Sequence, residues 1–421
     1  MILKPYRIQQ DTPDKGFLQI TVESQGRLSP VPGARVTVFY TGDPDSVITE
    51  MTTDGNGRLP ELELDTPPLE YSLTPGSNQP YAEYTIQVSA DGYETTTVSG
   101  TEVLPDSLAL QTINLRPLTS DETYDNIVIP AHTLYGDYPP KIAESETKPG
   151  FDSGEIVLSR VVIPEFVVVH DGVPTDTSAG NYYVRYRDYI KNVASSEIYA
   201  TWPRATIEAN VLAIMSFTLN RVYTEWYRNK GYDFTITSST AFDQKWIYGR
   251  NIFESISEVV DELFELYLSR PNVRQPILTQ YCDGKRVSCP NWLSQWGSKS
   301  LGEQGYTPIE IIRYYYGDNM YINNAEQISG IPASWPGYDL TYGATGQKVE
   351  QLQEQLNAIS EGFPLIPKVT VDGIYGPRTA ESVSVFQNVF GLPETGSVDY
   401  RTWYKIQEIY VGVTRIAELY P

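Results

Sequence analysis

Short runs of alternating apolar and polar residues fill the first 118 residues of the chain. The clearest of these runs lie at residues 17–22, 34–39, 84–88 and 110–115. Alternation puts every second side chain on one face of a strand, and clusters of Asp, Gly and Asn between the runs are typical of turns. The pattern therefore predicts an antiparallel β-sandwich over residues 1–118.

Helical spacing replaces this alternation in the middle of the chain. Apolar residues recur every three or four positions, which predicts helices at residues 185–199, 205–228, 251–269 and 307–316. Thr307 suits an N-cap, and Pro308 suits the first helical position. Two β-rich runs around Pro164 precede the first helix. We expect a mixed α+β domain over residues 156–330.

Residues 119–155 separate these two domains and show neither the alternation of a strand nor the three- or four-residue spacing of a helix. The segment is acidic and rich in Pro and Gly. Such a composition predicts an exposed linker in which a protease can bind an extended backbone without unfolding a core.

A small helical unit is predicted at the C-terminus, after a linker that starts at residue 331. Val349, Leu352, Leu356 and Ile359 recur at helical spacing, and Pro377 opens a second helix. With a third helix around Trp403, residues 331–421 read as a linker and a three-helix domain. The whole chain is thus predicted to be a multidomain α+β protein.

Glu197 is the most informative single residue. The predicted helix at 185–199 has an apolar stripe through Ile190, Val193 and Ala194, and the same spacing places Glu197 on it. Burial and the negative end of the helix dipole both raise the pKa of a carboxyl group. A carboxylic acid that is still protonated near neutral pH can act as a general acid. The alternative is a structural glutamate at a frayed helix end.

Charge and composition narrow the class of partner. The net charge of −22 and the pI near 4.5 argue against nucleic acid and against anionic lipid. The 32 tyrosines suit carbohydrate recognition, because each offers a flat apolar face and a polar tip. We find no apolar run long enough to span a membrane and no apolar core of a secretory signal after Met1.

Cys282 and Cys289 are the two cysteines, seven positions apart. Three interpretations stay open: a local disulfide, a pair of free thiols, or part of a zinc site. The zinc site would need further ligands, and the two histidines, His132 and His170, do not have the usual spacing. We expect no metal and no cofactor.

Several strings resemble the catalytic domain of the stage II sporulation protein D family: YIKNV at 189–193, SEI at 196–198, WP at 202–203, DQ at 243–244, YG at 248–249, LSQWG at 293–297, GY at 305–306 and EIIRYYY at 310–316. Members of that family are lytic transglycosylases that act on peptidoglycan. The resemblance implies that Glu197 is the catalytic acid. It also implies that Asp243, Gln244, Ser294 and Gln295 orient the acid and the substrate, and that Trp202, Tyr248 and Trp296 contact the substrate.

The chain departs from that family at several places. A basic residue, a Gln and an Arg are usual along the second helix, where this chain has Glu208, Asn210 and Met215. SCP at 288–290 stands where the family has Gly-His-Gly. We expect these changes to affect how the substrate is bound more than where the acid lies.

The two terminal units also have resemblances. PGARVTV at 32–38, TDGNGR at 53–58 and ADGY at 90–93 resemble prealbumin-like sandwiches, which implies a supporting or masking domain. Residues 341–411 resemble the type 1 peptidoglycan-binding domain through Gly346, Val349, Leu352, Gln353 and Leu356, DG at 372–373, YG at 375–376, Thr379, FQ at 386–387, GL at 391–392, Gly396 and TW at 402–403. We expect Asp372, Tyr375 and Gln387 to contribute to binding there.

The order of the three units resembles that of the clostridial spore cortex-lytic enzymes. This implies a zymogen stored in the spore, in the cortex or the outer spore layers, and activated by a subtilisin-like protease that removes the N-terminal part. Two other functions stay open: a non-catalytic wall-binding protein of a wall-crossing assembly, and an amidase acting on the stem peptide. The amidase is disfavoured because metal-dependent amidases need a set of zinc ligands that the two histidines do not supply.

Overall fold

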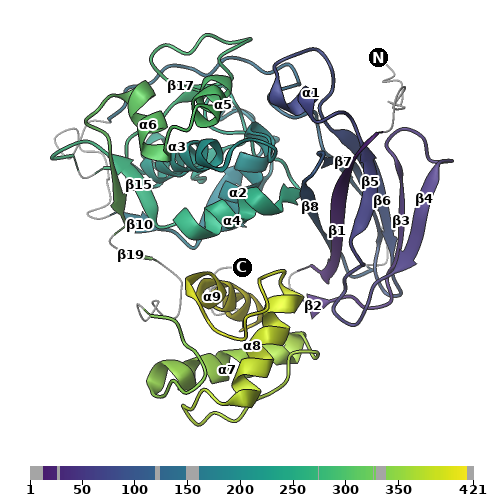
Figure 1. The fold of residues 1–421 in the computed structure, drawn as a ribbon. Coiled ribbons are helices and arrows are strands. Elements are labelled where there is room, and N and C mark those ends of the chain that lie inside the picture. Colours follow the sequence, from purple (N-terminus) through teal and green to yellow (C-terminus); the bar gives the residue numbers. More distant parts are fainter. Residues whose placement is uncertain are drawn as a thin grey trace.

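Three units pack against one another in the computed structural model (Figure 1). It describes residues 13–25, 29–118, 124–147, 161–273, 275–325, 327–328 and 338–414. A single connected cluster of buried apolar side chains runs through all three units. The N-terminal unit is β-rich, the central unit mixes helices with short strands, and the C-terminal unit is helical.

The N-terminal unit is a sandwich of two sheets, as the alternation predicts. Apolar positions such as Ile20, Val36 and Ile86 are fully buried between them. One sheet contains β1 (Asp14–Ser24), β2 (Ser29–Pro30), β5 (Leu62–Thr66) and β8 (Leu108–Leu115). The other contains β3 (Arg35–Tyr40), β4 (Val47–Thr52), β6 (Ala82–Ser89), β7 (Thr95–Val103) and β9 (Tyr124–Val128), while α1 (Glu70–Leu73) lies between β5 and β6 in the chain.

The prediction of a purely antiparallel sandwich was wrong. β1 pairs with β8 in parallel, and β7 pairs with β9 in parallel. Alternation of apolar and polar residues sets which face of a strand is buried, but it carries no information on the direction of its partner. Strands joined by long connections, such as β1 and β8, are free to pair in either direction.

The sandwich and the central unit share a sheet. β14 (Ile252–Phe253) of the central unit pairs antiparallel with β8, so the first sheet continues across the boundary between the two units. The side chain of Asn251 bonds to both the backbone N–H and the carbonyl of Glu102. The two units therefore join through backbone pairing and not only through side-chain packing.

The central unit is built around α3 (Arg204–Tyr223), most of whose side chains are buried. Around it lie α2 (Tyr186–Glu197), α4 (Glu254–Leu263), α5 (Gln295–Glu303) and α6 (Pro308–Tyr316). Thr307 and Glu310 form a capping box at the start of α6, which confirms that predicted helix start. The remaining elements are η2 (Arg228–Lys230) and the short strands β10 (Val162–Ile163), β11 (Phe166–His170), β12 (Asn181–Arg185), β13 (Ile236–Thr237), β15 (Leu266–Ser269), β16 (Tyr281–Cys282), β17 (Leu293–Ser294), β18 (Tyr321–Asn324) and β19 (Gln327–Ile328).

The helix predicted at 251–269 is shorter than expected. Only Glu254–Leu263 is helical, and the residues on either side form β14 and β15. β15 pairs antiparallel with β18, more than 50 residues further along the chain. Pairing with distant partners outweighs the local helical spacing at both ends, because apolar side chains are buried in either arrangement. The preceding helix, α3, likewise ends at Tyr223 and not at 228.

Residues 129–147, which we call the strap, contradict the expectation of an exposed linker at 119–155. β9 comes first and adds to the sandwich, and the strap then follows the surface of the central unit. Its backbone bonds to Ser196, Ala241 and Leu278 of that unit. A segment without local periodicity is ordered here because its partners lie on other elements. Residues 119–123 and 148–155 lie outside the described residues.

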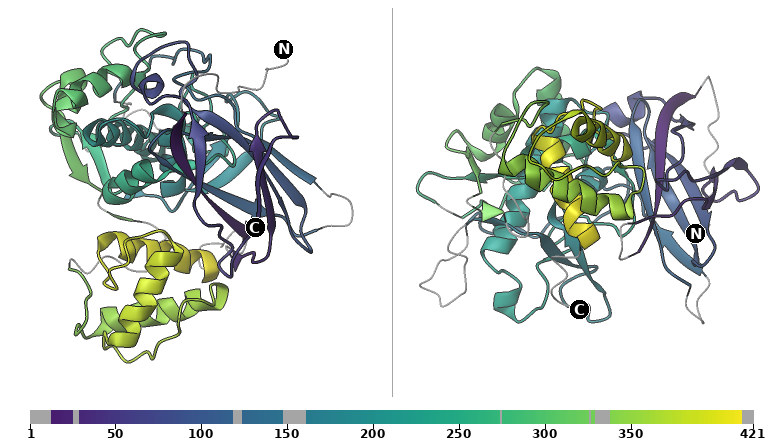
Figure 2. Two further views of the ribbon diagram at one scale, coloured as in Figure 1. Left: turned by 45° about the vertical axis from the view of Figure 1, so that its right-hand side comes forward. Right: turned by 90° about the horizontal axis from the view of Figure 1, so that it is seen from below.

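The C-terminal unit consists of α7 (Gln347–Gly362), α8 (Pro377–Val389) and α9 (Tyr400–Thr414). It lies below the central unit and next to the β2 end of the sandwich in Figure 1, and Figure 2 shows it from two further sides. Arg58 of the sandwich donates to the carbonyls of Asn388 and Val389, and Arg401 pairs with Glu258 on α4. In the described part of the chain, no helix is long and apolar enough to cross a membrane.

Candidate active site

Glu197 is the last residue of α2 and is buried, with 3% of its surface exposed, as its spacing predicts. The chain turns at Ile198, and Pro203 precedes α3. The backbone N–H of Lys245 donates to Oε1 of Glu197 at 2.7 Å. Oε2 is buried and has no well-formed hydrogen bond to any described residue. One carboxylate oxygen is therefore held in place while the other is available to a ligand.

Burial raises the pKa of Glu197 above its ordinary value. The Lys141 ammonium, the Lys245 N–H and the Tyr281 hydroxyl act in the opposite direction, but burial dominates. A raised pKa increases the fraction of protonated carboxyl near neutral pH, which is the state that a general acid needs.

Asp243 and Gln244 were predicted to orient the acid, and the structure places both in the interior. The Asp243 carboxylate accepts hydrogen bonds from Arg221, Tyr227 and Thr237 and is fully buried. Gln244 bonds to Tyr189 and Thr218, and to the carbonyl of Ile214. Neither side chain lines the cavity beside Glu197. They fix the loop that carries the Lys245 N–H, so their effect on Glu197 is indirect.

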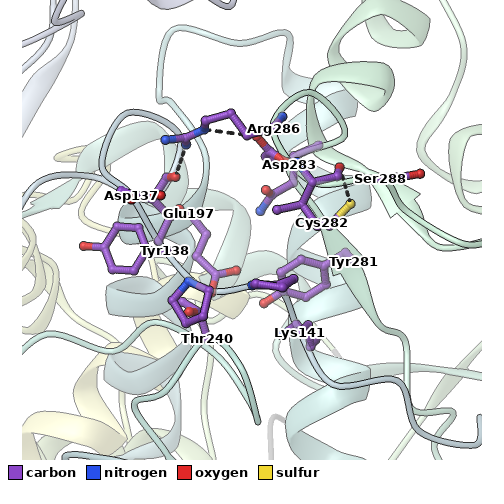
Figure 3. Close-up of a pocket in the computed structure, with 15 residues that line it drawn as sticks. Asp137, Tyr138, Lys141, Glu197, Thr240, Tyr281, Cys282, Asp283, Arg286 and Ser288 are labelled. Carbon is purple, nitrogen blue, oxygen red and sulfur yellow. Dashed lines mark hydrogen bonds and ion pairs between the residues drawn. The ribbon is translucent and has the colours of Figure 1, made fainter.

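A cavity of about 480 Å³ lies in front of Glu197 (Figure 3). Three segments that are distant in the sequence line it: the strap, Thr240, and the region between Tyr281 and Gln295. The lining residues are Thr133, Asp137, Tyr138, Pro139, Pro140, Lys141, Glu197, Thr240, Tyr281, Cys282, Asp283, Arg286, Val287, Ser288 and Gln295.

Tyr281 is a residue of this site that the sequence analysis missed. It lies on β16 and is buried, and its hydroxyl is close enough to Glu197 to hold the pKa of that carboxyl down. The hydroxyl, like Oε2 of Glu197, lacks a well-formed hydrogen bond to the described residues. Both groups point into the same space in Figure 3. Two neighbouring polar atoms at a cavity wall are suited to bind a substrate oxygen between them.

Cys282 and Cys289 are joined by a disulfide, which is one of the three interpretations that the sequence left open. The loop that they close forms one wall of the cavity. Within it Asp283 accepts hydrogen bonds from the backbone N–H groups of Arg286 and Val287. Gly284 has a φ of +75°, and a Cβ there would lie 1.8 Å from Oγ of Ser294. The loop is thus fixed by its bridge, its turn and a close approach to β17.

Of the remaining predicted site residues in the central unit, only Gln295 lines the cavity. Ser294 caps α5 by accepting from the N–H of Gly297. Trp202 and Trp296 pack against each other in the interior with their rings tilted, and the indole of Trp202 donates to the carbonyl of Ser72 in the sandwich. Tyr248 packs against Tyr182 and Trp246. The predicted substrate contacts of these aromatic residues stay predictions.

The three residues predicted to bind wall polymer in the C-terminal unit make bonds within that unit. Asp372 accepts from the side chain of Gln353 and from the N–H of Ile374. Tyr375 is fully buried and donates to the carbonyl of Gly396. Gln387 is also buried and bonds to Thr395 and Thr402. These contacts hold the loops between the helices, and a direct role in binding stays a prediction.

Residues 345–406 match the family model described as a putative peptidoglycan binding domain. The match covers α7, α8 and the start of α9, and it confirms the C-terminal prediction. The chain therefore carries a peptidoglycan-binding domain, and peptidoglycan is its partner there. A cell-wall-related function follows for the protein.

No curated protein matches this chain. Among solved structures, the Bacillus anthracis TIE protein is 17% identical, with 25% of this chain and 18% of that chain covered and a TM-score of 0.18. 3-Chlorocatechol 1,2-dioxygenase from Rhodococcus opacus 1CP is 13% identical, with 26% and 62% covered and a TM-score of 0.18. Catechol 1,2-dioxygenase from Acinetobacter sp. ADP1 is 16% identical, with 27% and 56% covered and a TM-score of 0.19. The chain spans less than two thirds of each, and likenesses of this size carry no argument.

Proposed function

We propose that this protein is a lytic transglycosylase that cleaves the muramic acid to glucosamine bonds of peptidoglycan, with Glu197 as its catalytic acid. The observation that carries the proposal is the buried Glu197 carboxyl, one oxygen of which has no well-formed bond to the described residues and lies on the wall of the cavity. The raised pKa supports its role as a proton donor.

The reaction needs a single acid. Glu197 gives its proton to the glycosidic oxygen as the bond from that oxygen to C1 of the muramic sugar breaks. The 6-hydroxyl of the same sugar then bonds to C1 and returns its proton to the Glu197 carboxylate. The products are an anhydro end and a free hydroxyl, and the enzyme regains its starting state. A glycoside hydrolase would instead need a second carboxylate to act on water or on the sugar.

The other carboxylates that line the cavity support the single-acid scheme. Both oxygens of Asp283 accept hydrogen bonds within the disulfide loop. Asp137 lies on the strap and is exposed. Neither is a buried group comparable with Glu197. The Tyr281 hydroxyl is suited to bind the glycosidic oxygen or the 6-hydroxyl beside the acid.

The C-terminal unit supplies attachment in this scheme. Peptidoglycan is an insoluble polymer, so an attached binding domain raises the effective concentration of the catalytic unit at its substrate. No chemistry is required of that unit.

The order of units, which resembles that of SleC, the clostridial spore cortex-lytic enzyme, supports a more specific role. In that role the protein is a zymogen in the spore, acts on cortex peptidoglycan during germination, and is activated by a subtilisin-like protease. The strap supports latency, because it lies over the cavity that contains Glu197.

The test uses the full chain with two inserted recognition sequences for a sequence-specific protease, one after the exposed Pro139 and one between residues 148 and 160. Cutting both gives the twice-cut protein, from which the strap fragment that carries Lys141 can diffuse. We expect the twice-cut protein to release anhydro-ended fragments from cortex sacculi, and its Glu197→Gln variant to bind sacculi and release none. Reducing ends without anhydro sugars would indicate hydrolysis, and full activity of Glu197→Gln would overturn the assignment of the acid. A twice-cut protein that binds sacculi without cleaving them would indicate the non-catalytic alternative.

A further inference from the structure

The strap forms one wall of the cavity in front of Glu197. Thr133 bonds through both its N–H and its hydroxyl to the carbonyl of Ser196, the neighbour of Glu197. Residues 137–141 then form part of the wall of the cavity that Glu197 and Tyr281 also line (Figure 3). The strap therefore narrows the space through which a glycan strand could reach Glu197.

Lys141 is the strap residue that contacts interior groups next to the site. Its ammonium donates to the carbonyl of Asp243 and lies 4.7 Å from the ring centre of Phe217 and 4.6 Å from that of Tyr281. Two aromatic faces and a carbonyl oxygen form a site for a cation. Since the Tyr281 ring is part of both the cavity wall and this site, Lys141 shares a partner with the region that a substrate would enter.

Two glutamates hold the part of the strap that follows Lys141. The Glu144 carboxylate makes a bidentate pair with Arg221, whose guanidinium is fully buried. The Glu146 carboxylate makes a bidentate pair with Arg270. Bidentate pairs to a carboxylate are among the stronger polar contacts, and Arg221 would lose a partner in the interior if the strap left.

Arg286 of the disulfide loop holds the other end. Its guanidinium donates to three backbone carbonyls of the strap, those of Thr133, Tyr135 and Gly136. The strap is thereby fastened on both sides of the residues that face Glu197. These contacts depend on folded neighbours and not on chain continuity beyond residue 147.

The sandwich ahead of the strap is also firmly joined to the central unit. β8 and β14 share a sheet, and the ion pair between Glu102 and Arg250 is completely buried. The side chain of Gln111 donates to the carbonyl of Gly249 as well. A cut beyond residue 147 breaks none of these contacts.

We propose that the strap is a removable wall of the Glu197 cavity, that Lys141 seats it there, and that a cut between residues 148 and 160 leaves it bound. Such a cut yields a nicked complex, and the activating event is the departure of the segment that carries Lys141. The effect on activity rests on the proposed function, whereas the position of the strap at the cavity does not.

Whether the strap stays seated at the cavity is measured by the reaction of lysine amines with an acetylating reagent, followed by peptide mass spectrometry. Lys15 serves as the reference because 47% of its side chain is exposed. We expect Lys141 to react at least about tenfold more slowly than Lys15 in both the intact and the once-cut protein, because its reaction requires local opening. The once-cut protein, cut only between residues 148 and 160, should also elute as one species on size exclusion.

The ion pairs of Glu144 and Glu146 that hold the strap are tested in the once-cut protein. The Glu144→Gln/Glu146→Gln double variant should raise the acetylation rate of Lys141, whereas Ser145→Ala, at the exposed position between them, should not. Equal rates for Lys141 and Lys15 in the unmodified once-cut protein, or release of its N-terminal piece on the column, would overturn the proposal.

Activity separates this proposal from the proposed function. We expect the once-cut protein to leave sacculi intact and the twice-cut protein to cleave them. Equal cleavage by the two, with Lys141 still protected in the once-cut protein, would show that the strap does not block the site and would overturn its inhibitory role. A third outcome is that neither protein cleaves sacculi, although Lys141 is protected from acetylation before the second cut and reacts freely after it. In that case the transglycosylase assignment fails, while the seating of the strap at the cavity stands.

Discussion

Arg250 of the central unit and Glu102 of the sandwich form an ion pair of 2.9 Å with both side chains withdrawn from solvent. Removing a carboxylate from water is costly, and this burial outweighs the attraction of Arg250 and raises the pKa of Glu102 to about 7. The boundary between the two units therefore contains a group that titrates near neutral pH.

The first prediction follows from the sign of that shift. A carboxyl with a raised pKa in the folded state binds its proton more tightly there than in the unfolded chain, so stability falls as pH rises from about 4.5 through about 7. The loss from this group is up to about 3 kcal/mol. Glu102→Gln should flatten the difference in unfolding free energy between pH 5 and pH 8. The exposed Glu63→Gln should keep the slope of the parent protein, and an unchanged slope in Glu102→Gln would contradict the shift.

A second prediction concerns Tyr281. The Tyr281→Phe variant of the twice-cut protein should fold and should lose activity on sacculi by about tenfold or more, because a hydroxyl at the acid no longer binds the reacting oxygens. The Tyr281 hydroxyl also holds the pKa of Glu197 down, so its removal should move the high-pH limb of the activity profile to higher pH. Tyr316→Phe, which removes a hydroxyl bonded to the carbonyl of Gln280, is the control.

Lys141 gives a third prediction, which is measured without any reaction. Its ammonium holds the pKa of Glu197 down, so in the intact chain Lys141→Met should raise that pKa. The carbon-13 chemical shift of the Glu197 carboxyl, assigned with Glu197→Gln, reports the titration. Lys15→Met should leave the titration unchanged, and so a shift in both variants would argue against a local effect.

The fourth prediction concerns the interior support of the Lys245 loop. Asp243→Asn removes the charge that pairs with the fully buried Arg221, and such a loss typically costs about 3–5 kcal/mol. The exposed pair of Asp65 and Lys15 is the matched comparison, since Asp65→Asn should cost less than about 1 kcal/mol. Urea unfolding followed by tryptophan fluorescence measures both, and similar losses would contradict the structural role of Asp243.

The fifth prediction concerns attachment to the wall. Removal of residues 338–421 should weaken retention on sacculi by at least about tenfold, because the chain loses its binding domain and the effective concentration that it provides. The twice-cut form of the shortened chain should still cleave short soluble glycan fragments. Unchanged retention would show that the other units bind the polymer by themselves.

The position of Glu197 could be predicted from the sequence because every determinant is local. Ile190 and Val193 define the stripe, and Pro203 limits how far the helix can run. Tyr281 could not be found in this way, because it reaches Glu197 only through tertiary packing of β16. Spacing within one element carries no information on which distant residue will face it.

The strap and β14 were missed for a related reason. Ile252 and Phe253 sit next to a run with helical spacing, and only the edge of β8 selects the extended form. Residues 129–147 have no period at all, and the carboxylates of Glu144 and Glu146 find arginines that are more than 70 residues away. A sequence segment without periodicity has no locally determined structure. Contacts with distant residues can still order such a segment.

Through Arg58, the sandwich contacts the C-terminal unit as well as the central unit. Its guanidinium bonds to the carbonyls of Asn388 and Val389, at the C-terminal end of α8, while Glu102 of the same sandwich reaches Arg250 in the central unit. One N-terminal unit thus contacts both the peptidoglycan-binding unit and the unit that carries Glu197. The two units are mechanically linked through the sandwich, and a change that displaces the sandwich alters the geometry of both at once.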